Sequence, residues 1–139
     1  MVPISKQTGL GWTTLSVDDS AGAAQVIKND VNQFNFATPR AVIDVTGVDA
    51  VAFERLLGLA DFTIELTGTF NAAATFSHAV FSTVPSSSVE RTVSLGIGGK
   101  TLAVECLFSD YALTRAASGE LTWTAPGSRS SGAAAPTWA

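Results

Sequence analysis

The sequence is poor in the residues that most often carry out chemistry. It has one cysteine, Cys106, and one histidine, His78, in 139 residues. A single cysteine cannot form an internal disulfide, and one isolated histidine does not complete a zinc site. Cys106 lies in an apolar, alternating stretch, which is typical of a small buried residue. Because no base, metal or nucleophile set converges, we predict a protein that is not an enzyme and has no cofactor-binding residues.

Charge is also scarce, with 14% of residues charged against about 25% in a typical domain. The net charge is −4 and lysine and arginine form no cluster. A protein that grips nucleic acid shows a basic face, so this class is disfavoured. Low charge, together with much Ala, Gly, Ser and Thr, suits a protein whose surface is covered by neighbouring subunits.

Long hydrophobic runs are absent as well, since none approaches the roughly 18 residues of a membrane helix. Residues 1–6 contain one cation and no apolar core of a signal peptide. We therefore expect the chain to be made, and to fold, in a cytoplasm. Its length fits one domain, which we place at residues 1–126. Residues 127–139, rich in Gly, Ser, Ala and Pro, are expected to form a flexible C-terminal arm that becomes ordered on assembly.

Most of what the sequence does contain is the period-2 alternation of β-strands. Residues 62–70 place an apolar residue or glycine at every even position and a polar residue at every odd position. The same pattern predicts further strands, which are at residues 12–17, 24–28, 31–36, 41–46, 89–97, 102–108 and 121–124. We predict a mainly β fold.

A glycine-rich segment, Ser94–Thr101, differs from the phosphate-binding P-loop in having Ser94 in place of the first glycine. A P-loop needs a helix after the glycines, whereas residues 101–108 alternate as a strand. Gly98 and Gly99 therefore predict a hairpin turn.

One flanking helix is predicted over residues 49–58. Asp49 suits the N-cap and Gly58 the position after the last turn. The apolar residues of the segment would form one broad side of the helix, made up of Val51, Phe53, Leu56 and Leu57. A shorter helical turn is a second possibility over residues 75–81.

Several ordered segments resemble the major tail, or tail-tube, proteins of long-tailed actinobacterial phages. Among them are Thr38–Arg40, Asp44–Gly47, Glu54–Phe62, Gly68–Asn71 and Leu121–Gly127. The similarity extends over roughly residues 12 to 138 and consists of ordered segments, with no chemical signature.

This resemblance implies a β-sandwich or β-barrel-like tail-tube fold with one flanking helix and an extended loop. It further implies subunits that assemble into stacked hexameric rings. It also implies a location in the virion tail, contact with other tail proteins such as the tape measure, and a lumen through which DNA passes without specific binding. Ring closure requires head-to-tail contacts between copies, for which the segment from Phe36 to Val48 and the two ends of the chain are the candidates. The individual residues predicted at these contacts are Trp12, Phe36, Pro39, Arg40, Val42, Asp44 and Trp138.

Two other interpretations remain open from the sequence. A head-decoration or tail-completion protein uses similar β folds. A carbohydrate-binding β-sandwich module would use Trp12 and Trp138 as stacking surfaces, whereas Trp123 alternates with Leu121 and is predicted to lie in the core.

Overall fold

The computed structural model describes residues 12–130 and 135–139. The prediction made on residues 1–6 lies outside these residues. The described chain forms ten strands and one short helix. In chain order these are β1 (Trp12–Asp18), β2 (Ala24–Val26), β3 (Val31–Ala37), β4 (Arg40–Asp44), β5 (Arg55–Ala60), β6 (Thr63–Thr69), α1 (Ser77–Phe81), β7 (Arg91–Ile97), β8 (Lys100–Phe108), β9 (Ala112–Arg115) and β10 (Leu121–Arg129). The mainly β prediction is confirmed.

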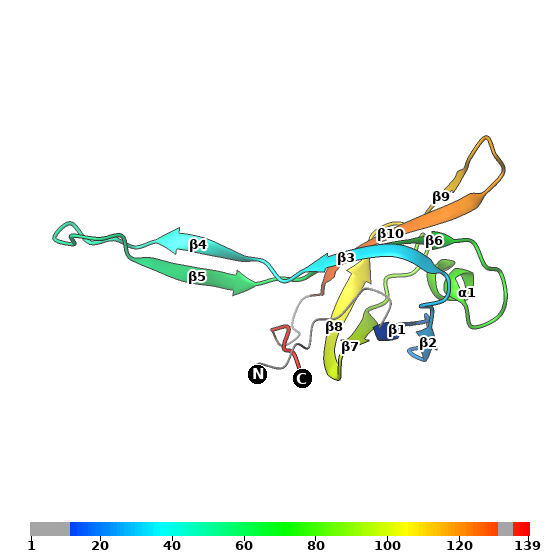
Figure 1. Cartoon of the computed structure of the whole chain (residues 1–139), viewed down its shortest axis with the longest axis horizontal. Coiled ribbons are helices and arrows are strands. Elements are labelled where there is room, and N and C mark those ends of the chain that lie inside the picture. Colours follow the sequence, from blue (N-terminus) through cyan, green and yellow to red (C-terminus); the bar gives the residue numbers. More distant parts are fainter. Residues whose placement is uncertain (1–11, 131–134) are drawn as a thin grey trace, which may run out of the picture.

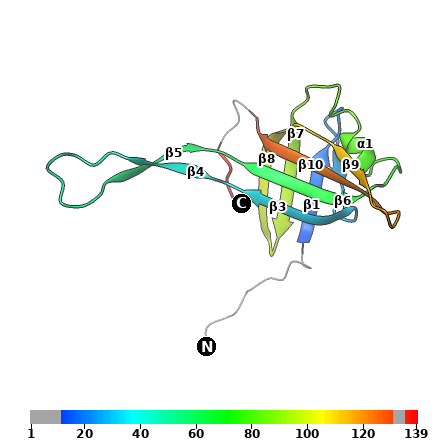
Figure 2. The same cartoon turned by 90° about the horizontal axis from the view of Figure 1, so that it is seen from above.

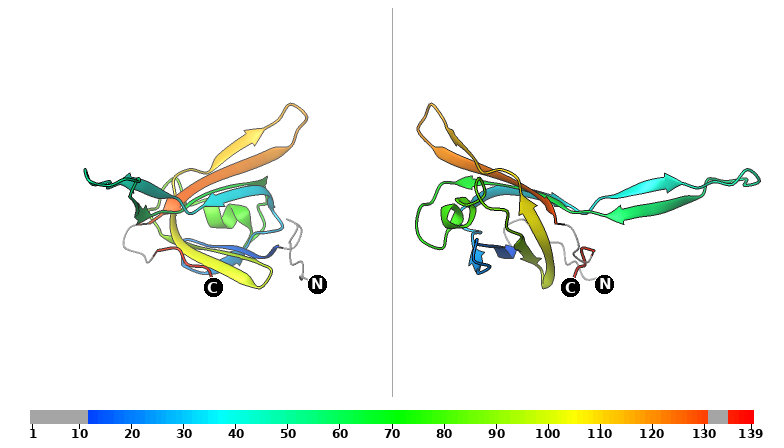
Figure 3. Two further views of the ribbon diagram at one scale, coloured as in Figure 1. Left: turned by 60° about the vertical axis from the view of Figure 1, so that its left-hand side comes forward. Right: turned by 180° about the vertical axis from the view of Figure 1, so that it is seen from behind.

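Eight of the strands form one antiparallel sheet with the order β2-β1-β7-β8-β10-β6-β3, and β9 pairs with β10 beside this path. The sheet bends over on itself, so that β3, β6 and β10 lie above β1, β7 and β8, with α1 at one end of the space between them (Figures 1 and 3). The two remaining strands, β4 and β5, form a separate two-stranded sheet that projects from this body.

The core consists of the inward-facing residues of the folded sheet. In β6, Ile64, Leu66 and Gly68 are buried while the residues between them face outward or are half-buried, as the alternation of residues 62–70 predicts. Trp123 is fully buried, which confirms its predicted place in the core. Its indole nitrogen donates a hydrogen bond to the Thr69 carbonyl at 3.0 Å, so its polar group is satisfied inside.

The glycine-rich segment forms the turn between β7 and β8. Ile97 pairs with Lys100, leaving Gly98 and Gly99 as a two-residue loop. Their φ angles are 60° and 78°, and positive φ at both positions is the requirement of a type I′ turn. The hairpin prediction is confirmed, and a strand stands where a phosphate-binding loop would need a helix.

The helix predicted over residues 49–58 is wrong. Residues 55–60 form strand β5, and residues 47–50 form a turn closed by a hydrogen bond from the Ala50 amide to the Gly47 carbonyl at 3.1 Å. Pairing with β4 decides this outcome, because Val42 and Ile43 lie opposite Leu57 and Leu56. Cross-strand pairs of this kind stabilise an extended segment and override a weak local helix preference.

The helix that does form is α1, within the weaker helical prediction for residues 75–81. A buried carboxylate holds its start: Asp30 accepts hydrogen bonds from the Ser77 amide at 3.1 Å and from the Asn71 side chain at 3.0 Å. Val80 and Phe81 then enter the core.

Strand β10 ends at Arg129, so residues 127–129, which we predicted to begin the flexible C-terminal arm, belong to the sheet. Gly127 and Ser128 pair with both β6 and β8. Residues 131–134 of that predicted arm lie outside the described residues, and residues 135–139 lie beside β8.

Candidate functional site

The most distinctive feature of the molecule is the β4–β5 hairpin, here called the arm (residues 40–60). It extends away from the folded sheet as two strands and a loop (Figures 1 and 2). Arg40 pairs with Ala60 at its root and Asp44 with Arg55 nearer the tip. An isolated two-stranded hairpin is marginally stable in water, so a hairpin of this length is expected to have a partner.

The arm exposes all of its large apolar side chains. Phe53 is 73% exposed and Leu59 93% exposed. The full set on the arm is Val42, Ile43, Val45, Val48, Val51, Phe53, Leu56, Leu57 and Leu59. Exposed apolar residues scattered singly are ordinary, but a contiguous group marks a contact surface.

Both faces of the arm are apolar. Val42 and Leu57 are directly opposed, as are Ile43 and Leu56. Because successive residues of a strand point to opposite faces, the first pair lies on one face and the second pair on the other. An arm that rests on a single surface would need only one apolar face, so this arm is suited to lie between two surfaces.

Polar contacts within the arm shape its backbone. Arg40 donates from Nε to the Gly58 carbonyl at 2.8 Å, across the root. Near the tip, the Asp44 carboxylate accepts from the Thr46 side chain at 2.6 Å and from the Thr46 amide at 2.9 Å, and these hydrogen bonds lower the pKa of Asp44. The Thr46 hydroxyl accepts from the Glu54 amide at 2.9 Å, which joins the two halves of the hairpin beyond the ends of the strands.

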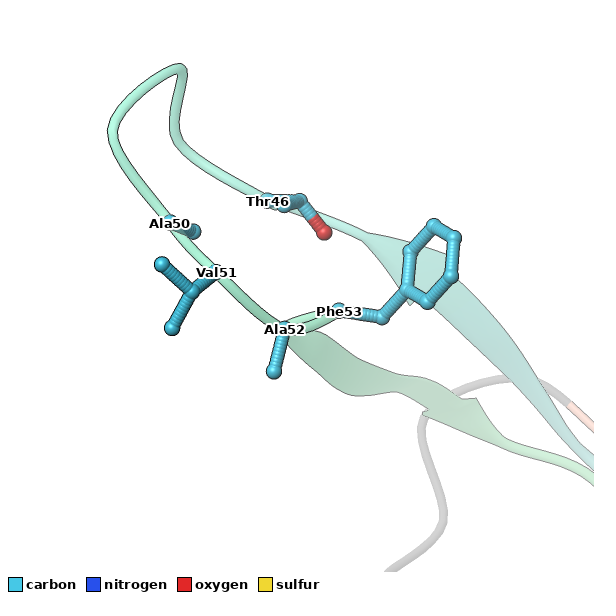
Figure 4. A pocket seen from close by; sticks show the side chains of 5 residues that line it. All are labelled: Thr46, Ala50, Val51, Ala52 and Phe53. Carbon is cyan, nitrogen blue, oxygen red and sulfur yellow. The ribbon is translucent and has the colours of Figure 1, made fainter.

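The tip carries a shallow hollow of about 220 Å³, lined by Thr46, Ala50, Val51, Ala52 and Phe53. In Figure 4, Val51 and Ala52 point away from the loop and Phe53 lies on the other side of the chain. The guanidinium carbon of Arg55 lies 4.9 Å from the centre of the Phe53 ring, a cation–π contact. The lining has one hydroxyl and no ionisable group, so the hollow suits an apolar side chain and not a charged ligand.

An aromatic cluster lies near the root of the arm, at the end of β3. The Trp12 ring meets Phe34 edge-on at 4.9 Å between centroids and Phe36 at 6.2 Å. Phe36 in turn lies 6.1 Å from Trp138. These contacts are within one chain, and they join β1, β3 and residues 135–139 beside the start of the arm.

The groups that would have to perform chemistry are packed as structural residues. Cys106 is fully buried, and burial first, then the neighbouring Glu105 charge, raises the pKa of its thiol to about 12. Such a thiol is a poor nucleophile at neutral pH. His78 lies against the Phe70 ring, and its Nδ1 is 3.2 Å from the Tyr111 hydroxyl.

Among residues 12–130 and 135–139, no three His, Cys, Asp or Glu side chains gather in a way that would hold a metal ion. The described part of the chain also has no helix long and apolar enough to cross a membrane.

The seven residues predicted at subunit contacts fall into two groups. Trp12, Phe36 and Trp138 come together in the aromatic cluster. Pro39, Arg40, Val42 and Asp44 lie along the root and first strand of the arm. Whether they contact a second copy stays a prediction. The structure adds the exposed residues of the second half of the arm, from Val51 to Leu59. The sequence prediction had placed four of them, Val51, Phe53, Leu56 and Leu57, on the apolar side of a helix.

Comparison with solved structures finds the same fold in chains of gene transfer agent particles. The chain superposes on a chain of the tail of an empty gene transfer agent particle, determined with C6 symmetry, with a TM-score of 0.71 and 18% sequence identity. A second match, with a TM-score of 0.67 and 15% identity, is to the virion of a native gene transfer agent particle. Each alignment covers 96% of this chain and 99% of the other. No family model matches the sequence, and no curated protein matches it significantly.

Proposed function

We propose that this protein is a structural subunit of a phage-like tail, and that its copies associate into stacked hexameric rings that form the tail tube. The fold likeness covers nearly all of both chains and involves a tail with C6 symmetry. It supports the proposal at the level of fold, since the identity is low. The single observation in this chain that carries the proposal is the arm, with apolar side chains exposed on both of its faces.

The geometry of the arm fits a repeating assembly. In a closed ring each subunit makes head-to-tail contacts with two neighbours, and stacking of rings adds a further set. An arm with two apolar faces can be covered on both sides when it enters the junction between two such surfaces. Each of the four paired residues, Val42, Ile43, Leu56 and Leu57, is between 48% and 62% exposed. Covering each of them contributes about 1 kcal/mol, roughly half the value for burying a whole side chain.

The charge of the chain fits a conduit for DNA. Duplex DNA carries one negative charge per ~1.7 Å of its axis and adheres to basic surfaces. A subunit with net charge −4 and only eight basic residues provides a neutral or repelling lumen. On this proposal the DNA passes without specific binding, and the tube contacts other tail proteins, including the tape measure.

The experiment replaces each face of the arm separately in the full-length protein. The first variant is Val42→Thr with Leu57→Thr, and the second is Ile43→Thr with Leu56→Thr. Threonine keeps the extended backbone favourable while it removes most of the apolar surface. The control is Val26→Thr, because Val26 is 58% exposed on β2, away from the arm.

Wild type and the control are expected to form hollow tubes in negative-stain micrographs. Each arm variant is expected to raise the protein concentration needed for tubes about 30-fold, which corresponds to the loss of roughly 2 kcal/mol per subunit contact. All variants should keep the thermal midpoint of the subunit. If both arm variants form tubes as well as wild type does, the arm has no role in assembly. A wild-type protein that stays monomeric at high concentration and is absent from virions would refute the proposed function.

The same micrographs separate the other virion roles, since isolated rings or monomers that bind particles indicate a head-decoration or tail-completion protein. A carbohydrate-binding module would bind glycans and lose binding on replacement of Trp12 or Trp138. The proposal also includes that the tail belongs to an actinobacterial phage and that the subunit is made in the cytoplasm of the host.

A further inference from the structure

The middle of the folded sheet contains an edge that β10 leaves uncovered. Strand β8 is paired with β7 from Lys100 to Cys106 on one side. On its other side β10 pairs with Cys106, Leu107 and Phe108, and the Ser130 amide donates to the Glu105 carbonyl at 3.0 Å. Beyond that point, from Thr101 to Val104, this side of β8 would be an open strand edge.

Residues 135–139, here called the edge segment, lie along this stretch. Trp138 forms a bridge with Leu102. Thr101 and Ala139 exchange two hydrogen bonds, from the Thr101 amide to the Ala139 oxygen at 2.9 Å and from the Ala139 amide to the Thr101 carbonyl at 2.8 Å. The Trp138 ring reaches Phe36 of β3, which adds a side-chain contact to the backbone pairing.

The edge segment continues the ladder that β10 begins. Arg129 is opposite Cys106 and Trp138 is opposite Leu102. The nine residue steps from Arg129 to Trp138 thus correspond to four steps along β8. The ladder therefore resumes in the same direction after five additional residues. The chain returns to the edge that it left, instead of ending where β10 separates from β8.

We propose that the β8 edge is a strand-binding site and that the edge segment occupies it to keep strands of other copies out. Open strand edges pair with other chains, and proteins that avoid such pairing cover them. Here the stretch between Thr101 and Val104 has no proline or charged residue that would discourage pairing. This role is independent of the tail-tube assignment, because it concerns pairing through one edge and not contacts made by the arm.

The direction of the backbone groups gives a selective way to block this edge. The backbone groups of Thr101 and Glu105 point toward the open side, and because alternate residues of a strand point the same way, those of Ala103 do too. Leu102 and Val104 then bond toward β7. Proline at position 103 removes an amide on the open side without removing a bond to β7, and Ala103 is exposed.

The test uses full-length variants. The undocked variant is Trp138→Ala with Ala139→Pro. It loses the ring contact between Trp138 and Phe36 and the hydrogen bond from the Ala139 amide to the Thr101 carbonyl. Thr137→Ala is the matched control, since the described contact of the Thr137 side chain is with the Ala135 carbonyl and not with β8. The rescue variant adds Ala103→Pro to the first pair. All are made in the Ile43→Thr, Leu56→Thr background, in which association through the arm is weakened.

Hydrogen exchange is expected to show faster exchange at Thr101 in the undocked variant, by on the order of tenfold, with Leu102 and Val104 unchanged. Light scattering is expected to show that this variant associates at a concentration where the control is monomeric, and that Ala103→Pro reverses the association. The proposal is overturned if the undocked variant stays as monomeric as the control. It is equally overturned if the association persists with Ala103→Pro, since the β8 edge is then not the surface that pairs.

Discussion

Replacing Gly68 by alanine is expected to destabilise the subunit more than any comparable glycine substitution in a strand. Gly68 is buried in β6, between Val31 of β3 and Trp123 of β10. A Cβ atom at this position would lie 2.0 Å from the Asp30 carbonyl oxygen and 2.9 Å from Cζ2 of Trp123. The first of these atoms is backbone, so the methyl group fits only if the chain at Asp30 moves.

The cost follows from what Asp30 holds. Its carbonyl accepts from the Thr69 amide at 3.0 Å, and its carboxylate holds Ser77 and Asn71 at the start of α1. Weakening three hydrogen bonds costs about 1 kcal/mol each, and overpacking a core typically costs about 1–3 kcal/mol. These contributions overlap, and alanine regains roughly 0.4–1 kcal/mol by restricting the unfolded chain. We therefore expect a net loss of about 3 kcal/mol.

The assay is urea unfolding at neutral pH, followed by tryptophan fluorescence, in the Ile43→Thr, Leu56→Thr background, in which assembly through the arm is weakened. With a slope of roughly 2 kcal/mol per molar urea, the midpoint should fall by about 1.5 M. Gly96→Ala is the control, because its Cβ would lie 3.1 Å from the Thr14 Cβ and 3.2 Å from the Thr14 hydroxyl oxygen, a clash that a shift of a few tenths of an ångström relieves. It should cost less than about 1 kcal/mol. If Gly68→Ala is no more destabilising than Gly96→Ala, the close approach of Asp30 to β6 is not as the structure has it.

Two further predictions concern buried groups. The Cys106 thiol should resist alkylation at pH 8 until the chain is unfolded. Its pKa rises from 9.0 to about 12 on folding. Its contribution to stability should therefore be complete below pH 9 and be lost between pH 9 and 12, by about 1.4 kcal/mol per pH unit. Urea unfolding across this range should show about that slope, and Cys106→Ala should reduce it by the share of the thiol. Tyr111, whose pKa is also raised by burial, contributes in the upper part of the range. Rapid native-state labelling of Cys106 would contradict its burial. Asp30→Asn should cost about 1–3 kcal/mol, since an amide cannot accept on both sides as the carboxylate does, and it should speed hydrogen exchange at Ser77 while leaving β7 and β8 protected; unchanged exchange at Ser77 would show that Asp30 does not hold α1.

The strands were largely predictable from alternation, because a half-buried strand records its two faces in the sequence. This worked for residues 62–70, and for the Gly98-Gly99 turn, where the backbone conformation itself requires glycine. It failed for residues 49–58. Their apolar residues fit the buried side of a helix as well as a strand, and periodicity alone does not separate the two in so short a segment.

Part of the candidate site was predictable for a related reason. The resemblance pointed to the segment from Phe36 to Val48, which contains β4 and the first half of the arm. The second half was missed, because large apolar residues such as Phe53 and Leu59 are ordinarily assigned to a core. Their exposure depends on the absence of a third strand beside the arm in the described chain, which residues 49–59 do not encode.

The sequence by itself determined the β class and the inward positions of strands such as β6 and β8, because these depend on residue type and local periodicity. The tertiary structure decided which strands pair, that β4 and β5 leave the sheet as an arm, that β6 passes within contact of Asp30, and that Trp138 returns to β8. All of these join residues far apart in the chain. The side-chain pattern of a strand specifies the face that is buried, whereas the partner at its edge is chosen by backbone hydrogen bonds that every residue type except proline can make.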